Sequence, residues 1–199
     1  MAIVVDALTK STSATFQHTC SGNDGMLIVM AAFVPDNEQE TVSIKYNGRN
    51  LTFDYLQGGL GLNLAVGYLV APDVGTHDVE VSIINTPPCL CVALSLNGVK
   101  QDSPIWDFRS AVGHLVRDLP IHIHLKTNAM TIGVGVTNDV NAGLEKVQEG
   151  QVLQFDEIGN GMRAISISTI GPMDIDMPLP NRLTKDADWG IFVLGIDPS

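Results

Sequence analysis

Residues 66–84, VGYLVAPDVGTHDVEVSII, decide the fold class. Small and apolar residues fill positions 66–71, and Pro72, Asp73 and Gly75 then mark a turn, because proline lacks a backbone donor and all three residue types favour turns. After the turn, apolar Val79, Val81 and Ile83 alternate with polar Asp78, Glu80 and Ser82. A strict period of two is typical of a half-buried strand. The stretch therefore predicts two strands joined as a hairpin with one dry face.

The rest of the chain repeats this pattern of short strands and turns. Further strands are expected at residues 11–19, 26–34, 41–46, 49–53, 90–96, 119–126, 130–137, 152–155, 162–170 and 189–196. Asn47-Gly48 and the GNG at 159–161 are hairpin signals. About twelve short strands without a sustained helical pattern predict an all-β protein, an antiparallel β-sandwich of jelly-roll-like arrangement.

A chain of 199 residues suits one hydrophobic core, so residues 1–199 are expected to form a single domain. Two stretches depart from the strand pattern. Residues 99–118 follow neither strand nor helix periodicity and predict an irregular insertion, either a long loop or a loop with a short helical turn. Residues 171–188 are rich in proline and are expected to be extended.

The charge balance restricts the partners. The chain carries 22 acidic and 11 basic residues, a net charge of −11, which argues against nonspecific binding to nucleic acid or to an anionic membrane. Charged residues make up only 17%, so part of the surface is expected to be covered by a partner. Neither a basic, apolar leader nor a run of roughly 20 apolar residues occurs, and the sequence predicts a protein made and kept in a cytoplasm.

The three cysteines, Cys20, Cys89 and Cys91, are an odd and sparse set that predicts reduced, buried thiols. We expect Cys89 and Cys91 to point to opposite faces of one strand.

Residues with possible chemistry are scattered. His122 and His124 share a strand face and could bind a metal with His18, His77 or His114 as a third ligand; Asp174 with Asp176, or Asp36, Glu38 and Glu40, could bind calcium. The alternative in each case is a solvated or interface face. The Asp174–Asp176 pair could also serve glycoside hydrolysis, but no nucleophile-elbow or dinucleotide motif occurs. We therefore predict no enzyme activity, no catalytic residue, no metal and no cofactor.

The irregular stretch is the expected contact surface. Ile105, Trp106, Phe108 and Arg109 lie together, and aromatic and arginine side chains are common anchors at interfaces. Leu115 and Val116 add apolar residues without periodicity. The alternatives are that Trp106 and Phe108 form a sugar-binding platform or a core plug at one end of the sandwich.

Four segments carry a family resemblance: residues 45–52 (KYNGRNLT), 66–81, 94–105 (LSLNGVKQDSPI) and 188–197 (DWGIFVLGID). They resemble a β-sandwich module common in bacterial surface proteins and in phage open reading frames, with residues 14–105 matching best. The shared motifs are turns and core positions, so the resemblance implies a fold more than a chemistry.

Together these observations favour a non-enzymatic bacteriophage virion protein, a capsid decoration (cement) protein or another particle-surface protein. Its expected partners are major capsid or tail proteins and its own copies in a homo-oligomer, without nucleic acid or membrane. The alternative is a carbohydrate-binding or host-recognition module of a tail or surface protein, for which a surface glycan is the ligand. A hydrolase is the third hypothesis.

Overall fold

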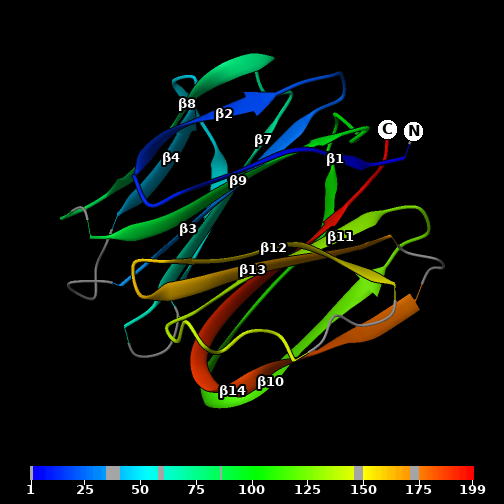
Figure 1. Cartoon of the computed structure of the whole chain (residues 1–199). Helices are drawn as coiled ribbons and strands as arrows, with labels where there is room; N and C mark the ends of the chain where they lie inside the picture. Colours follow the sequence, from blue (N-terminus) through cyan, green and yellow to red (C-terminus); the bar gives the residue numbers. More distant parts are fainter. Residues whose placement is uncertain (1, 35–40, 58–60, 86, 146–149, 171–174) are drawn as a thin grey trace.

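A computed structural model of the chain describes residues 2–34, 41–57, 61–85, 87–145, 150–170 and 175–199, with only the backbone described at 53–57, 120–125 and 175–181. The described residues are all-β: none of them is helical, and fourteen strands form three antiparallel sheets (Figure 1). Accordingly, they include no helix long and apolar enough to cross a membrane. The predicted all-β class is confirmed.

The three sheets are stacked in layers. The central sheet has the order β1 (Val4–Ser11), β9 (Cys89–Asn97), β3 (Met26–Phe33), β7 (Asn63–Val70) and β6 (Thr52–Gln57). The small sheet has the order β2 (Thr15–Cys20), β8 (Gly75–Ile83), β4 (Val42–Tyr46) and β5 (Arg49–Asn50). The ribbon sheet has the order β10 (Ile105–Leu125), β14 (Ile175–Ile196), β11 (Met130–Thr137), β13 (Met162–Ile170) and β12 (Gln151–Gly159).

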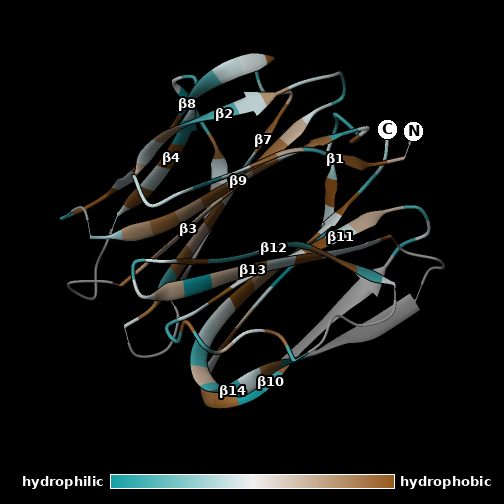
Figure 2. Ribbon diagram, in the orientation of Figure 1, coloured by the Kyte–Doolittle hydropathy of each residue, from teal (hydrophilic) through white to brown (hydrophobic). Residues whose placement is uncertain are grey.

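The central sheet is covered on both faces, which explains its composition. All eight residues of β3 are buried, as a continuous apolar run predicts. Met30 and Ala32 face the ribbon sheet, where they join Val134 and Phe192 in the first core; their neighbours Val29 and Ala31 turn the other way, into a second core against the small sheet. Figure 2 shows the hydrophobic residues concentrated along these inner strands.

The stretch at 66–84 forms two strands, but not a hairpin. β7 pairs with β3 and β6 in the central sheet, whereas β8 pairs with β2 and β4 in the small sheet. The turn at 71–74 therefore carries the chain from one layer to the next. The predicted alternation in β8 is confirmed, since Val79, Val81 and Ile83 are buried. Residues 66–71 are apolar on both faces of the strand, a pattern that indicates a strand covered on both sides rather than one arm of a half-buried hairpin.

Two-residue turns behave as their sequences predict. Asn47-Gly48 joins β4 to β5, with Tyr46 paired to Arg49, and Asn160-Gly161 joins β12 to β13. All four turn residues have positive φ, which asparagine and glycine tolerate best. The chain then changes layers again at buried Leu51, because β6 belongs to the central sheet.

The irregular insertion predicted at 99–118 is wrong from Ile105 onward, where the long strand β10 begins. β10 pairs with β14 along its whole length, from Ile105 opposite Ile196 to Leu125 opposite Ile175, with three register shifts. These shifts break the period of two, and for this reason the sequence pattern looked irregular. The proline-rich segment is extended from Ile175, as part of β14; residues 171–174 lie outside the described part.

Candidate interaction surface

The β10–β14 ribbon bends back on itself. Lys126 follows the end of β10, and Asp197 follows the end of β14. In a straight antiparallel ribbon of this length the two would lie about 70 Å apart, at roughly 3.3 Å per residue. Instead, Lys126 Nζ lies 2.6 Å from Asp197 Oδ1. The ribbon is therefore doubled over, and Figure 1 shows the curl at the foot of the ribbon sheet.

Two tryptophans pack on glycines across the ribbon. Gly113 lies opposite Trp189 in the register, and a Cβ added at Gly113 would lie 2.3 Å from Trp189 Cε2. A Cβ at Gly195 would lie 2.5 Å from Trp106 Cε2. Trp189 is only 2% exposed and belongs to a third apolar cluster with Leu119, Leu183 and Ile191 among others. Because this cluster fills the inside of the bend, it fixes the bent shape.

A buried carboxylate holds the backbone at the bend. Asp188 is 5% exposed and accepts hydrogen bonds from His114 Nδ1 at 2.6 Å, Leu115 N at 3.1 Å and Asn138 Nδ2 at 3.0 Å. Leu115 has a φ of 49°. A left-handed backbone costs a residue with a side chain about 1 kcal/mol or more, so it persists where surrounding contacts impose it.

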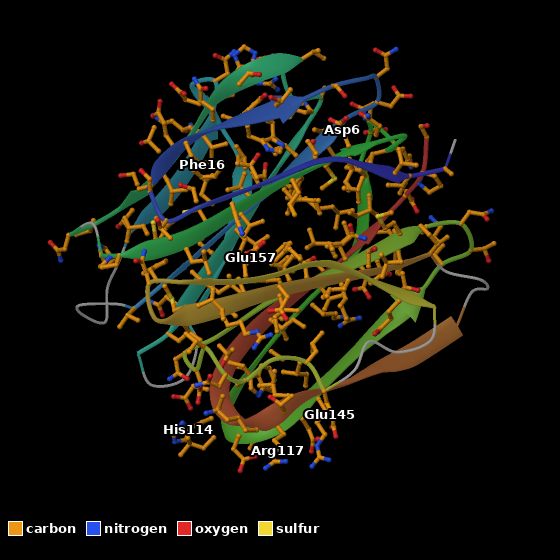
Figure 3. The ribbon with its side chains drawn as sticks, viewed as in Figure 1. Asp6, Phe16, His114, Arg117, Glu145 and Glu157 are labelled. Atoms are coloured by element: carbon orange, nitrogen blue, oxygen red, sulfur yellow. The ribbon has the colours of Figure 1, made fainter. Side chains whose placement is uncertain are left out.

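The bend displays apolar side chains to solvent. Leu115 is 62% exposed, Val112 46% and Val116 43%. We call these three residues the bend tip. Arg117, which is ion-paired with Asp186 at 3.0 Å, flanks the bend tip, and Figure 3 shows His114 and Arg117 at the outer edge of the molecule. Apolar side chains gathered on a projecting part of the surface are typical of a contact site for another protein.

The four residues predicted as anchors lie on the first half of β10 and do not share one surface. Phe108 packs on Phe192, with ring centroids 5.3 Å apart, and Ile105 also packs against the first core. Trp106 packs against the third cluster instead. Arg109 is exposed and ion-paired with Asp107 at 3.0 Å. This packing favours the core-plug alternative for Trp106 and Phe108; the exposed apolar part of the predicted stretch is the bend tip, which includes Leu115 and Val116.

Among the residues proposed for metal binding, His18 and His77 lie opposite each other in the β2–β8 register, but the described part of the chain contains no group of three His, Cys, Asp or Glu able to hold an ion. The backbone places His122 and His124 opposite Pro178 and Asp176 in the ribbon, in the part whose side chains are not described. Asp174 and the acidic loop with Asp36, Glu38 and Glu40 lie outside the described residues. His77 Nε2 lies 3.3 Å from the carbonyl oxygen of Val74.

A polar cluster joins β1, β2 and β9. Asp6 accepts hydrogen bonds from Ser21 N at 2.8 Å, from the Ser21 hydroxyl and from Ser95 Oγ at 3.0 Å. Burial acts to raise the pKa of Asp6, but these hydrogen bonds outweigh it and lower the pKa. The nearby His18 is 1% exposed, and its Nδ1 lies 2.9 Å from Thr9 Oγ1. The cluster ties the start of the turn after β2 to strands β1 and β9 of the central sheet.

The thiols are free, buried and structural. Cys89 and Cys91 share one face of β9, with Cys91 Sγ 3.5 Å from Cys89 Sγ. Their expected placement on opposite faces is wrong, because residues two apart on a strand point to the same side.

An apolar hollow lies on the outer face of the ribbon sheet, over Gly133 and Gly135, with Leu144, Leu183 and Trp189 at its rim. Its free space of about 30 Å³ is far below the roughly 300 Å³ at which ligand pockets begin. The hollow therefore does not supply a substrate site.

Comparison of the chain with family models, with curated proteins and with solved structures finds no match. The fold and the surface define the class of the chain: an all-β protein of three stacked sheets, whose bent ribbon exposes the apolar bend tip.

Proposed function

We propose that the chain is a non-enzymatic structural protein of a bacteriophage particle, a capsid decoration protein or another particle-surface protein, that binds a protein lattice through the bend tip. The observation that carries the proposal is Leu115, a large apolar side chain held 62% exposed on a left-handed backbone by buried Asp188. The left-handed backbone at Leu115 costs stability, and this cost has a physical reason if a partner covers the exposed side chain.

The order of the strands supports this proposal. We propose that residues 4–97 form a jelly roll, with β6 as an additional edge strand. With β6 left aside, the eight strands run in the orders 1-8-3-6 in the central sheet and 2-7-4-5 in the small sheet. These are the strand orders of the two sheets in the eight-stranded jelly roll, an architecture used by viral capsid proteins and lectins.

The family resemblance and the composition point the same way. The YNG turn at 46–48 joins two strands of the small sheet, and the turn at 71–74 carries the chain from the central sheet to the small sheet. Both turns belong to the motifs in which the sequence resembles a module of phage open reading frames. The proposed partners are major capsid or tail proteins, and the proposed location is the virion. With a net charge of −11 the chain is suited to a protein partner rather than to nucleic acid.

The alternative, a carbohydrate-binding module, needs an exposed aromatic platform. Trp106 is packed against Gly195 and the third cluster, and Phe108 against Phe192. Their rings are therefore engaged inside the protein, which favours the lattice-binding function.

The test is Leu115→Gly. Glycine adopts the left-handed backbone without cost, so this variant should fold at least as stably as the wild type while lacking the apolar side chain. Particles stripped of the chain should bind the variant about 30-fold more weakly, the effect of losing an anchor worth on the order of 2 kcal/mol. The matched control is Val74→Ala, because Val74 is 67% exposed on the small-sheet turn, away from the bend. Wild-type occupancy by Leu115→Gly, with its fold intact, would sink the proposal.

A further inference from the structure

The part of the β10–β14 ribbon that lies beyond the bend is only two strands wide. Residues 118–125 of β10 pair with residues 175–182 of β14 in an unbroken antiparallel register. β11 pairs with β14 only at residues 189–196, and β10 pairs with no strand other than β14 in the described part of the chain. Among the described residues, both outer edges of this ribbon end are therefore open. An open edge presents backbone donors and acceptors to which a strand of another chain can add.

Three prolines lie at this open end. They are Pro120 in β10 and Pro178 and Pro180 in β14, and the other described strands contain none. Pro120 lies directly opposite Pro180, and His122 lies opposite Pro178. Opposite residues of an antiparallel pair alternate between those that exchange ladder hydrogen bonds and those whose N–H and C=O point outward. Two facing prolines have no N–H to exchange, so Pro120 and Pro180 point outward, and Pro178, two residues away, does the same.

The hydrogen bonds beside the prolines agree with this assignment. Arg182 lies two residues from Pro180 and should also point outward. Its carbonyl oxygen accepts a hydrogen bond from Glu145 N at 2.8 Å, outside the ribbon, and Thr184 N donates to Gly143 O at 2.8 Å. The three prolines therefore remove donors from the outer edges and take no hydrogen bond from the ladder inside the ribbon.

The missing donors leave a long gap on the outer edge of β14. Residues 143–145 cover this edge at Arg182. The next two outward positions hold the two prolines of β14, so no donor points outward between Arg182 and Asp176, about 20 Å along the strand at roughly 3.3 Å per residue. A strand added here would leave two of its carbonyl groups without a donor inside the new sheet, which is unfavourable. Pro120 removes one donor from the β10 edge in the same way.

We propose that Pro120, Pro178 and Pro180 block the addition of another chain's strand to the ribbon end, and so keep copies of the chain from joining edge to edge through it. Proline suits this role because, at an outward position, it removes an edge donor without weakening the ladder. The ribbon end is separate from the bend tip, and its protection does not depend on the proposed function.

Amide hydrogen exchange of the wild type, resolved by residue with NMR, tests the direction of the backbone groups. The amides of Ile121, Ile123 and Leu179 belong to the ladder, whereas those of His122 and Asp176 point outward. The ladder amides should exchange more slowly than the outward amides, by about tenfold or more. Equal protection of the two sets would overturn the proposal, because the outer edges would then be paired.

Replacing the prolines tests the block itself. Pro178→Thr combined with Pro180→Thr restores two outward donors on a strand-forming residue. Sedimentation velocity at several concentrations should show this double variant associating on the order of 30-fold more tightly than the wild type, the effect of two hydrogen bonds gained. The amide of Asp176, on the same edge, should become protected as the variant associates. The matched control is Pro88→Thr, because Pro88 is exposed just before β9, outside the ribbon sheet, and this variant should behave like the wild type.

Thermal melting accompanies each variant. If the double variant fails to fold, Pro120→Thr makes the same comparison on the β10 edge, with an expected gain in association of about fivefold for its single donor. The proposal is wrong if the folded variants associate no more tightly than the wild type. It is equally wrong if Pro88→Thr associates as tightly as they do, because the ribbon edge would then not be the cause.

Discussion

Replacing Gly113 by alanine should destabilise the fold by about 2–4 kcal/mol. The new Cβ would lie 2.3 Å from Trp189 Cε2, and Trp189 is 2% exposed, so the indole would have to leave its packed position. Overpacking of this kind costs about 1–3 kcal/mol, and displacing the indole from its cluster costs more. The loss of glycine offsets only about 0.4–1 kcal/mol through the unfolded chain.

Gly133→Ala is the matched control, on β11 in the same sheet. Its Cβ would meet nothing closer than Ile167 Cγ1 at 3.4 Å, and it would partly fill the hollow over Gly133. It should therefore be neutral or stabilise by about 0.5 kcal/mol. Gly195→Ala should fall between the two, because the half-buried Trp106 can shift.

Urea unfolding measures all three free energies, and thermal melting should separate Gly113→Ala from Gly133→Ala by about 4–16 °C for a chain of this length. Equal stability of Gly113→Ala and Gly133→Ala would refute the packing of Trp189 on Gly113, and with it the tight bend of the ribbon.

Three further results are expected. Burial lowers the pKa of His18, opposed in part by Asp6, so the unfolded state takes up the proton at a higher pH than the folded state does. The free energy of unfolding should therefore fall as the pH drops below 6.5. His18→Gln should flatten that part of a profile of urea stability against pH, and an unchanged slope would contradict the burial of His18. Asp188→Ala should cost about 2–3 kcal/mol by chemical denaturation, because it strands the three donors at the bend, and a loss under about 0.5 kcal/mol would show that Asp188 does not hold it. Thiol titration should find three reactive thiols per chain only after denaturation, and a count of one would reveal a disulfide.

The sequence predicts individual strands well, because a strand's own residues carry its period. The alternation of β8 and the apolar run of β3 are local patterns, and the structure bears both out. Turn chemistry is local too, as at Asn47-Gly48. The pairing of strands, in contrast, depends on residues far apart in the sequence. β7 and β8 are joined by only four residues, yet they lie in different sheets because each pairs with strands elsewhere in the chain.

The surfaces were harder to predict for the same reason. Trp106 and Phe108 appeared free of periodicity because bulges in β10 shift the register that their packing depends on. Leu115 is apolar in the sequence, but its exposure depends on Asp188, more than 70 residues away. That β1 and β12 are edge strands is likewise a property of the assembled sheets that neither segment shows alone.

The copy number of the chain on purified particles tests the proposed function most directly. Particles from the cells that produce the chain are banded in a density gradient, washed, and analysed by quantitative mass spectrometry against their major capsid protein. A decoration protein should remain at a fixed ratio to the capsid protein from one preparation to the next. A chain that stays at the top of the gradient, or whose ratio falls towards zero with washing, would contradict a structural role in the particle.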